Sequence, residues 1–98
     1  MPAPVVIADE LTALGFRLAG ARVYVPQEHA VQRLFTDVCG EADLVLITAE
    51  KAALVPPAQL AAALVAARPL LAIIPDARGT VDVDDLTHEL RRALGVEE

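Results

Sequence analysis

Hydrophobic residues in this chain occur in short continuous runs, separated by segments in which they recur every three or four positions. The runs predict the strands Val5–Ala8, Val23–Val25, Leu44–Ile47 and Leu70–Ile74. Unbroken apolar character is typical of strands that are covered on both faces in a parallel sheet. Because helical segments separate the runs, the order of elements indicates an α/β fold with right-handed crossovers.

Three later segments carry the periodicity of helices that pack one face against a core. In Gln27–Cys39 apolar side chains recur at i, i+3, i+4, i+7 and i+8. Ala58–Ala67 and Asp82–Leu94 show similar spacing. The last segment also has acidic residues in its first turn and Arg91 and Arg92 in its last turn, which complements the helix dipole at both ends.

A shorter helix is expected between the first two strands. Asp9 precedes it and has the side chain of an N-cap residue, which accepts a hydrogen bond from a free backbone N–H group of the first turn. Leu11, Leu14 and Leu18 follow at i, i+3 and i+7 and therefore share one face of this helix.

The same helix carries a large aromatic residue and a cation away from its leucine face. We expect these two residues, Phe16 and Arg17, to lie on another surface. Gly15 permits the close approach of another backbone, and Gly20 is able to adopt the left-handed conformation that ends a helix.

These elements predict a small four-stranded parallel sheet in the order 2-1-3-4, flavodoxin-like or Rossmann-like, flanked by helices and followed by a C-terminal helix. Pro26 ends the second strand, which suits an edge position. We expect a single domain overall, with an α/β core over residues 1–75 and a loop with the C-terminal helix over residues 76–98. Gly79 in that loop allows the helix to move.

Composition and charge disfavour several classes of function. Of the 98 residues 55% are hydrophobic and only 3% aromatic, so the core is aliphatic and a pocket for a nucleobase or a flavin is disfavoured. Fourteen acidic residues against eight basic ones give a net charge of −6, which disfavours nucleic-acid binding. We expect no cofactor and no small-molecule substrate.

The number of cysteines and the lengths of the apolar runs indicate the cellular compartment in which we expect the protein. One cysteine excludes an internal disulfide and fits a reducing environment. The apolar stretch 52–74 is interrupted by Pro56, Pro57 and Pro69, so it falls short of the roughly 20 residues of a membrane-spanning helix. We expect no signal peptide, no membrane insertion and a soluble, cytoplasmic protein.

The glycine spacing of a phosphate-binding loop occurs once, between Gly15 and Gly20. The lysine and hydroxyl that complete such a loop are absent, because Ala21 and Arg22 stand in their places. The segment also leads into a strand rather than a helix. We therefore interpret it as a helix and its glycine stop.

The acidic pair Asp9-Glu10 is similar to the pair that holds magnesium in receiver domains. A receiver also needs an aspartate at the end of its third strand, where this chain has Ile47-Thr48. Without that phosphoacceptor we interpret both acids as residues of a helix N-terminus. A degenerate receiver-like or phosphocarrier-like signalling domain stays the alternative function, and a self-associating structural domain is a third.

Few residues are suited to act as nucleophiles or metal ligands. Cys39 lies at the C-terminal end of a helix, on its apolar face, so we expect a structural buried thiol. His29 and His88 lie on different helices without partners at metal-ligand spacing and are expected to be exposed. The chain contains no serine. We expect no catalytic, cofactor-binding or metal site.

Four segments of the chain form a characteristic series. They are Gly15-Phe16-Arg17-Leu18-Ala19-Gly20, Asp43–Glu50, Pro69–Pro75 and Leu90–Val96. With these segments in this order, the chain resembles the family of the F subunit of V-type/A-type rotary ATPases, which are also ATP synthases. The resemblance covers nearly the whole chain.

The resemblance implies a non-catalytic component of the central stalk, the rotor of the ATPase. The resemblance implies as partners the coiled-coil D subunit of the stalk and the catalytic head, and a role in modulating ATP hydrolysis or synthesis coupled to ion transport. The F subunit is peripheral to the membrane through the complex, and its mobile C-terminal helix matches Asp82–Leu94. The candidate partner-binding residues are Phe16, Arg17, Leu86, Leu90, Arg91, Arg92 and Leu94.

The apolar stripe of the C-terminal helix allows two uses. Leu86, Leu90 and Leu94 either form an inner face that covers the chain's own sheet or offer a docking stripe to another helix. Both uses need the same periodicity, so the sequence leaves them open.

Overall fold

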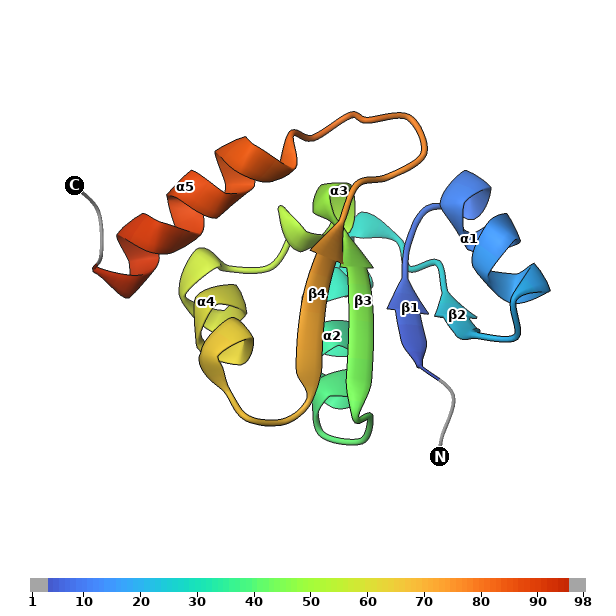
Figure 1. The fold of residues 1–98 in the computed structure, drawn as a ribbon, viewed down its shortest axis with the longest axis horizontal. Helices are drawn as coiled ribbons and strands as arrows, with labels where there is room; N and C mark the ends of the chain where they lie inside the picture. Colours follow the sequence, from blue (N-terminus) through green and yellow to red (C-terminus); the bar gives the residue numbers. More distant parts are fainter. Residues whose placement is uncertain (1–3, 96–98) are drawn as a thin grey trace.

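A computed structural model describes residues 4–95 of the chain, except for the side chain of Leu94. Its centre is a four-stranded, wholly parallel sheet in the order β2-β1-β3-β4 (Figure 1). The strands are β1 (Val5–Ile7), β2 (Arg22–Tyr24), β3 (Leu44–Thr48) and β4 (Leu70–Ile74). The predicted sheet and strand order are confirmed, and β2 lies at an edge as Pro26 indicated.

Six helical segments surround this sheet among the described residues. They are α1 (Glu10–Leu18), the 3-10 turn η1 (Glu28–Ala30), α2 (Val31–Cys39), α3 (Ala49–Ala52), α4 (Pro57–Val65) and α5 (Val83–Leu94). The prediction of one continuous helix over Gln27–Cys39 is therefore wrong in its first turn. The Gln27 side chain makes no capping hydrogen bond, and a 3-10 turn commonly leads into an α-helix whose start is not capped.

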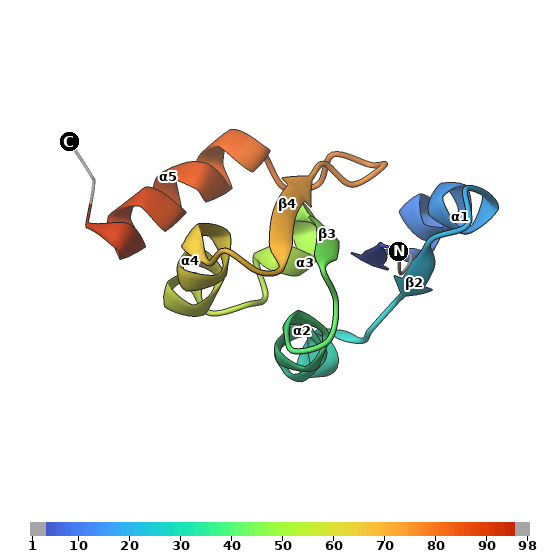
Figure 2. The same cartoon turned by 60° about the horizontal axis from the view of Figure 1, so that its bottom comes forward.

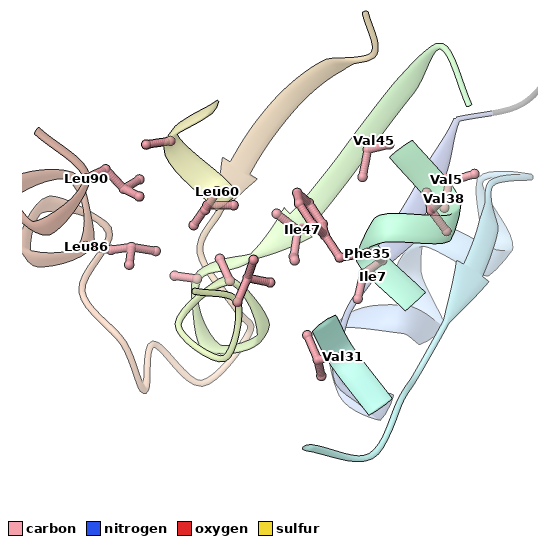
Figure 3. Packing of buried hydrophobic residues seen from close by; sticks show 14 residues of the cluster. Val5, Ile7, Val31, Phe35, Val38, Val45, Ile47, Leu60, Leu86 and Leu90 are labelled. Carbon is pink, nitrogen blue, oxygen red and sulfur yellow. The ribbon is translucent and has the colours of Figure 1, made fainter. Parts of the chain in front are cut away.

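The main core lies on the face of the sheet that carries α2 and α4 (Figures 1 and 2). Val5, Ile7 and Ile47 point from the strands into it, where they meet Phe35 of α2 and Leu60 of α4 (Figure 3). All five side chains are at most 2% exposed. This aliphatic layer, with a single phenylalanine, is the core that the composition predicted.

A second, smaller cluster lies under α1 on the opposite face. Val6, Ala8 and Ala13 are fully buried there, and Phe16 packs against them half-buried. The helix approaches the sheet through its small Ala13 rather than through its leucines.

The leucine face of α1 is solvent-exposed. Leu11 is 52% exposed, Leu14 57% and Leu18 84%, so the three residues share one face as predicted but do not bury it. Phe16 lies on another surface than the leucines, as expected, and this surface is the one that faces the sheet. Both sides of this helix are apolar, and the pattern alone did not distinguish them.

Only α1 covers this second face, and it lies over the β1–β2 half. The alternation of buried residues and the register Leu44–Leu70 and Leu46–Ala72 show which side chains of β3 and β4 point to this face. We call them the outer strip: Leu44, Leu46, Leu70, Ala72 and Ile74. In Figure 1, β3 and β4 are seen with no helix in front of them.

The last helix does not return to the sheet. Instead α5 packs chiefly against α4, beyond the β4 edge (Figures 1 and 2). Among residues 4–95, no helix combines the length and hydrophobicity that crossing a membrane requires.

Leu60 joins the sheet side of the core to α5, so we expect Leu60→Ala to lower the free energy of unfolding by about 2–5 kcal/mol. Leu64, one turn along the same helix and 36% exposed, is the matched control. Leu64→Ala should cost less than about half as much, because less of its side chain is withdrawn from water. Equal losses in urea unfolding would contradict this packing.

Candidate functional site

The candidate partner-binding residues do not form one site in this structure. Phe16 and Arg17 belong to α1, whereas Leu86, Leu90 and the arginines belong to α5. These two helices lie toward opposite ends of the long axis of the molecule, which extends over 41 × 29 × 22 Å (Figure 1). A partner that touched both groups would have to span most of that length.

The two candidates on α1 differ in accessibility. Phe16 packs on the second cluster and offers only part of its ring to a partner. Arg17 is exposed, and its Nη1 lies 3.8 Å from Oε2 of Glu10. Ion pairs between exposed side chains contribute at most about 1 kcal/mol, so the guanidinium group is readily available to another carboxylate.

The apolar stripe of α5 is occupied within the chain. Leu86 is 5% exposed and Leu90 4%, and both point toward α4, where Leu60 lies (Figure 3). The stripe thus packs on a neighbouring helix, which differs from both uses considered for it. Leu86 and Leu90 are accessible to a partner only when α5 separates from α4.

Both ends of α5 are capped, by residues that were not singled out as caps from the sequence. Asp82 Oδ1 accepts a hydrogen bond of 2.8 Å from the Asp84 N–H, and Gly95 ends the helix at φ 77°. Arg91 and Arg92 are exposed in the last turn. Leu94 belongs to the helix, but its side chain lies outside the described part of the chain.

The loop between β4 and α5 (residues 75–82) is attached to α1. The Thr12 hydroxyl accepts a 2.9 Å hydrogen bond from the Ala77 N–H and donates one of 2.6 Å to Asp9 Oδ1. Asp9 Oδ2 also accepts from the Thr12 N–H at 3.1 Å, which confirms the predicted N-cap. One threonine therefore joins the start of α1 to the segment that leads into α5.

The carboxylate of Asp76 stabilises the same loop through hydrogen bonds within it. Asp76 is buried, and its Oδ2 accepts hydrogen bonds from the N–H (3.1 Å) and the hydroxyl (3.0 Å) of Thr80. Gly79, at φ 64°, makes the turn between them. Oδ1 of Asp76 is also buried and has no hydrogen-bond partner among the described residues.

Hydrogen bonds lower the pKa of both carboxyl groups. Burial alone would raise the pKa of Asp76, but the bonds from the Thr80 N–H and hydroxyl outweigh it and hold that pKa below its usual value. The pKa of Asp9 is lowered in the same way, since the bonds from Thr12 outweigh the effect of burial. Both groups are therefore charged near neutral pH and support the loop as acceptors.

The remaining residues with reactive side chains lie apart from one another. Cys39 is half-buried against the main core, where burial raises the pKa of its thiol, so it fits the structural thiol that was expected. His29 and His88 are exposed, as predicted. Within residues 4–95, no three His, Cys, Asp or Glu side chains are grouped closely enough to hold a metal ion.

Sequence reasoning missed the outer strip as a possible binding surface. Leu70 is 69% exposed and Leu44 37%, although both begin strands whose unbroken apolar pattern indicated cover on both faces. The strand order contained the missing signal. In the order 2-1-3-4 only the first crossover places its helix on this face, and one helix does not cover four strands.

Comparison with known proteins identifies the family of the chain. The model of a protein family described as the ATP synthase (F/14-kDa) subunit matches residues 5–92, from the first strand into the last helix. A search of curated proteins found no match to the chain.

The link between α1 and the loop is tested by Thr12→Val, which removes the acceptor for the Ala77 N–H. We expect the Ala77 amide to exchange with solvent markedly faster and the free energy of unfolding to fall by about 1 kcal/mol. Thr87→Val is the control, because that hydroxyl bonds only to Val83 O within α5. Unchanged Ala77 exchange in Thr12→Val would show that the loop is held by other contacts.

The lowered pKa values of Asp9 and Asp76 predict a pH dependence of stability. Their contribution is complete above the ordinary aspartate pKa of about 4 and is lost as the pH falls through the lower folded values. The free energy of unfolding should therefore decrease below about pH 4, and less steeply in Thr80→Val, which lacks one donor to Asp76. Thr36→Val, whose hydroxyl bonds to Gln32 O, serves as control. Identical pH profiles for Thr80→Val and the control would be evidence against this role.

Proposed function

The chain belongs to the family of the ATP synthase (F/14-kDa) subunit, and from this premise we propose that it works in the central stalk of a V/A-type rotary ATPase. In this role it binds the coiled-coil D subunit of the stalk near the catalytic head and modulates ATP hydrolysis or synthesis coupled to ion transport. Members of this family are non-catalytic components of the ATPase complex. The chain would reach the membrane only through that complex, on its cytoplasmic side.

The observation that carries the proposal is the extent of the family match. Residues 5–92 include all four strands and most of α5, so the match covers the whole fold rather than one motif. The site geometry agrees with a binding role, since the polar side chains at the carboxyl ends of the strands serve as helix caps and loop contacts.

The proposed contacts fall into two groups with different requirements. Arg17, Arg91 and Arg92 are exposed, so acidic side chains of the partner can reach them while α5 stays packed on α4. Leu86 and Leu90 belong to a second group, which contributes only if α5 moves away from α4. Phe16 offers the part of its ring that the sheet leaves exposed. Leu94 stays a proposed contact whose side chain lies outside the described part of the chain. We propose that the mobile part is the segment 76–98, which includes most of the loop described above and α5.

The proposal is tested by producing the chain together with the companion coiled-coil stalk subunit of the same ATPase. A stable complex of the two in size-exclusion chromatography, and an altered ATPase rate of the assembled head on adding the chain, are the expected results. A chain that elutes alone under all conditions would overturn the proposed function.

Arg91→Glu tests the exposed end of α5. We expect association with the stalk subunit to slow by roughly threefold or more and to depend less on salt, because exposed charges act mainly on the rate of encounter. Arg33→Glu is the control, since the Arg33 side chain is 87% exposed and lies on α2, which carries none of the proposed contacts. If both variants associate at the same rate, Arg91 is not part of the contact.

A further inference from the structure

The outer strip is apolar and no helix of the described chain covers it; Leu44 and Leu70 are exposed, whereas Leu46, Ala72 and Ile74 are partly buried. We propose that the strip, together with the adjoining flank of α1, is the surface on which one helix of the coiled-coil stalk partner docks. This inference rests on the proposed function and adds the location of its contact. It adds a contact on the sheet to the contacts proposed above for α1 and α5.

The shape of the strip fits a helix. Parallel sheets are normally covered on both faces by helices, and here α1 covers the β1–β2 half while the β3–β4 half is open (Figures 1 and 2). Strands β3 and β4 have five residues each, about 17 Å at the rise of a strand. This length accommodates about three turns of an α-helix running beside α1.

The flank of α1 beside the strip is lined by small side chains. Thr12 lies on that flank, because its hydroxyl bonds to Ala77 just after β4. Gly15 and Ala19 follow at i+3 and i+7 and therefore lie on the same side. A Cβ atom added at Gly15 would have no neighbour within 4 Å among the described residues.

Gly15 thus weakens the helix without any packing contact in this chain to account for it. Glycine in the interior of a helix is unfavourable relative to alanine, and its φ here is not in the left-handed region that requires glycine. The expectation from sequence was that Gly15 admits a close backbone. That backbone is not in the described part of this chain, and a partner helix lying on the strip would supply it.

Charge favours a different chain over a second copy as the occupant. The net charge of −6 makes two copies repel each other, whereas it attracts a basic partner. Near the start of the strip, Arg68 is paired with Asp43, so the exposed Leu70 is not flanked there by an unbalanced charge. The occupant we infer is therefore an amphipathic helix with an apolar stripe bordered by lysine or arginine.

Two substitutions test this surface, each measured for binding to the companion stalk subunit and for thermal unfolding. Leu70→Asp places a charge on the strip, and Gly15→Gln fills the open flank. Val65→Asp is the matched control, because Val65 is 69% exposed, as is Leu70, but lies on α4. We expect about tenfold or greater loss of affinity in the two strip variants and little change in the control.

The unfolding midpoints separate a lost contact from a damaged fold. Gly15→Gln should unfold at or above the wild-type temperature, because glutamine favours the helix and has free space, while its affinity falls. Failure of the wild-type chain to bind the stalk subunit would overturn the proposed function, and this inference with it. Wild-type binding that neither strip variant weakens would overturn the inference alone. So would self-association that Leu70→Asp abolishes, because a second copy would then be the occupant.

Discussion

The right-handed crossover between parallel strands is the constraint that determines where every other feature of this chain lies. With the strand order β2-β1-β3-β4, the connection through α1 must pass on one face, and those through α2 and α4 must pass on the other. The main core and its single phenylalanine therefore form on the α2–α4 face. The opposite face receives one short helix and stays open over β3 and β4. The uncovered apolar strip thus results from topology, without any special sequence motif.

The final helix could have closed that face but lies elsewhere. Burial of Leu86 and Leu90 against α4 holds α5 beyond the edge of the sheet. The loop that precedes it is held by the hydrogen bonds from the Ala77 N–H to Thr12 and from Thr80 to Asp76. Helix α5 is thus held by apolar contacts with α4, and the loop before it is held by a hydrogen bond to α1. Because Leu86 and Leu90 also belong to the main core cluster, separation of α5 from α4 would expose part of that core.

Much of this architecture could be read from the sequence, because continuous apolar strands, helix caps and periodic stripes are local signals. Asp9 and Asp82 cap the helices that they were expected to begin. The orientation of α1 was not predictable, since its leucine face and its Ala13–Phe16 face are both apolar and only the space above β1 selects between them. Packing of α5 on α4, the anchoring of the loop and the open strip depend on contacts between distant segments, which no local pattern encodes.

The central claim is that a partner covers the outer strip, and the accessibility of one position on it gives the most direct test. In a Cys39→Ala background, the alkylation rate of Leu70→Cys is measured for the free chain and for its complex with the stalk subunit, with Val65→Cys as reference. Our account predicts that complex formation slows alkylation at residue 70 by about tenfold or more and leaves residue 65 unchanged. Equal alkylation of residue 70 in the free and bound chain would contradict it.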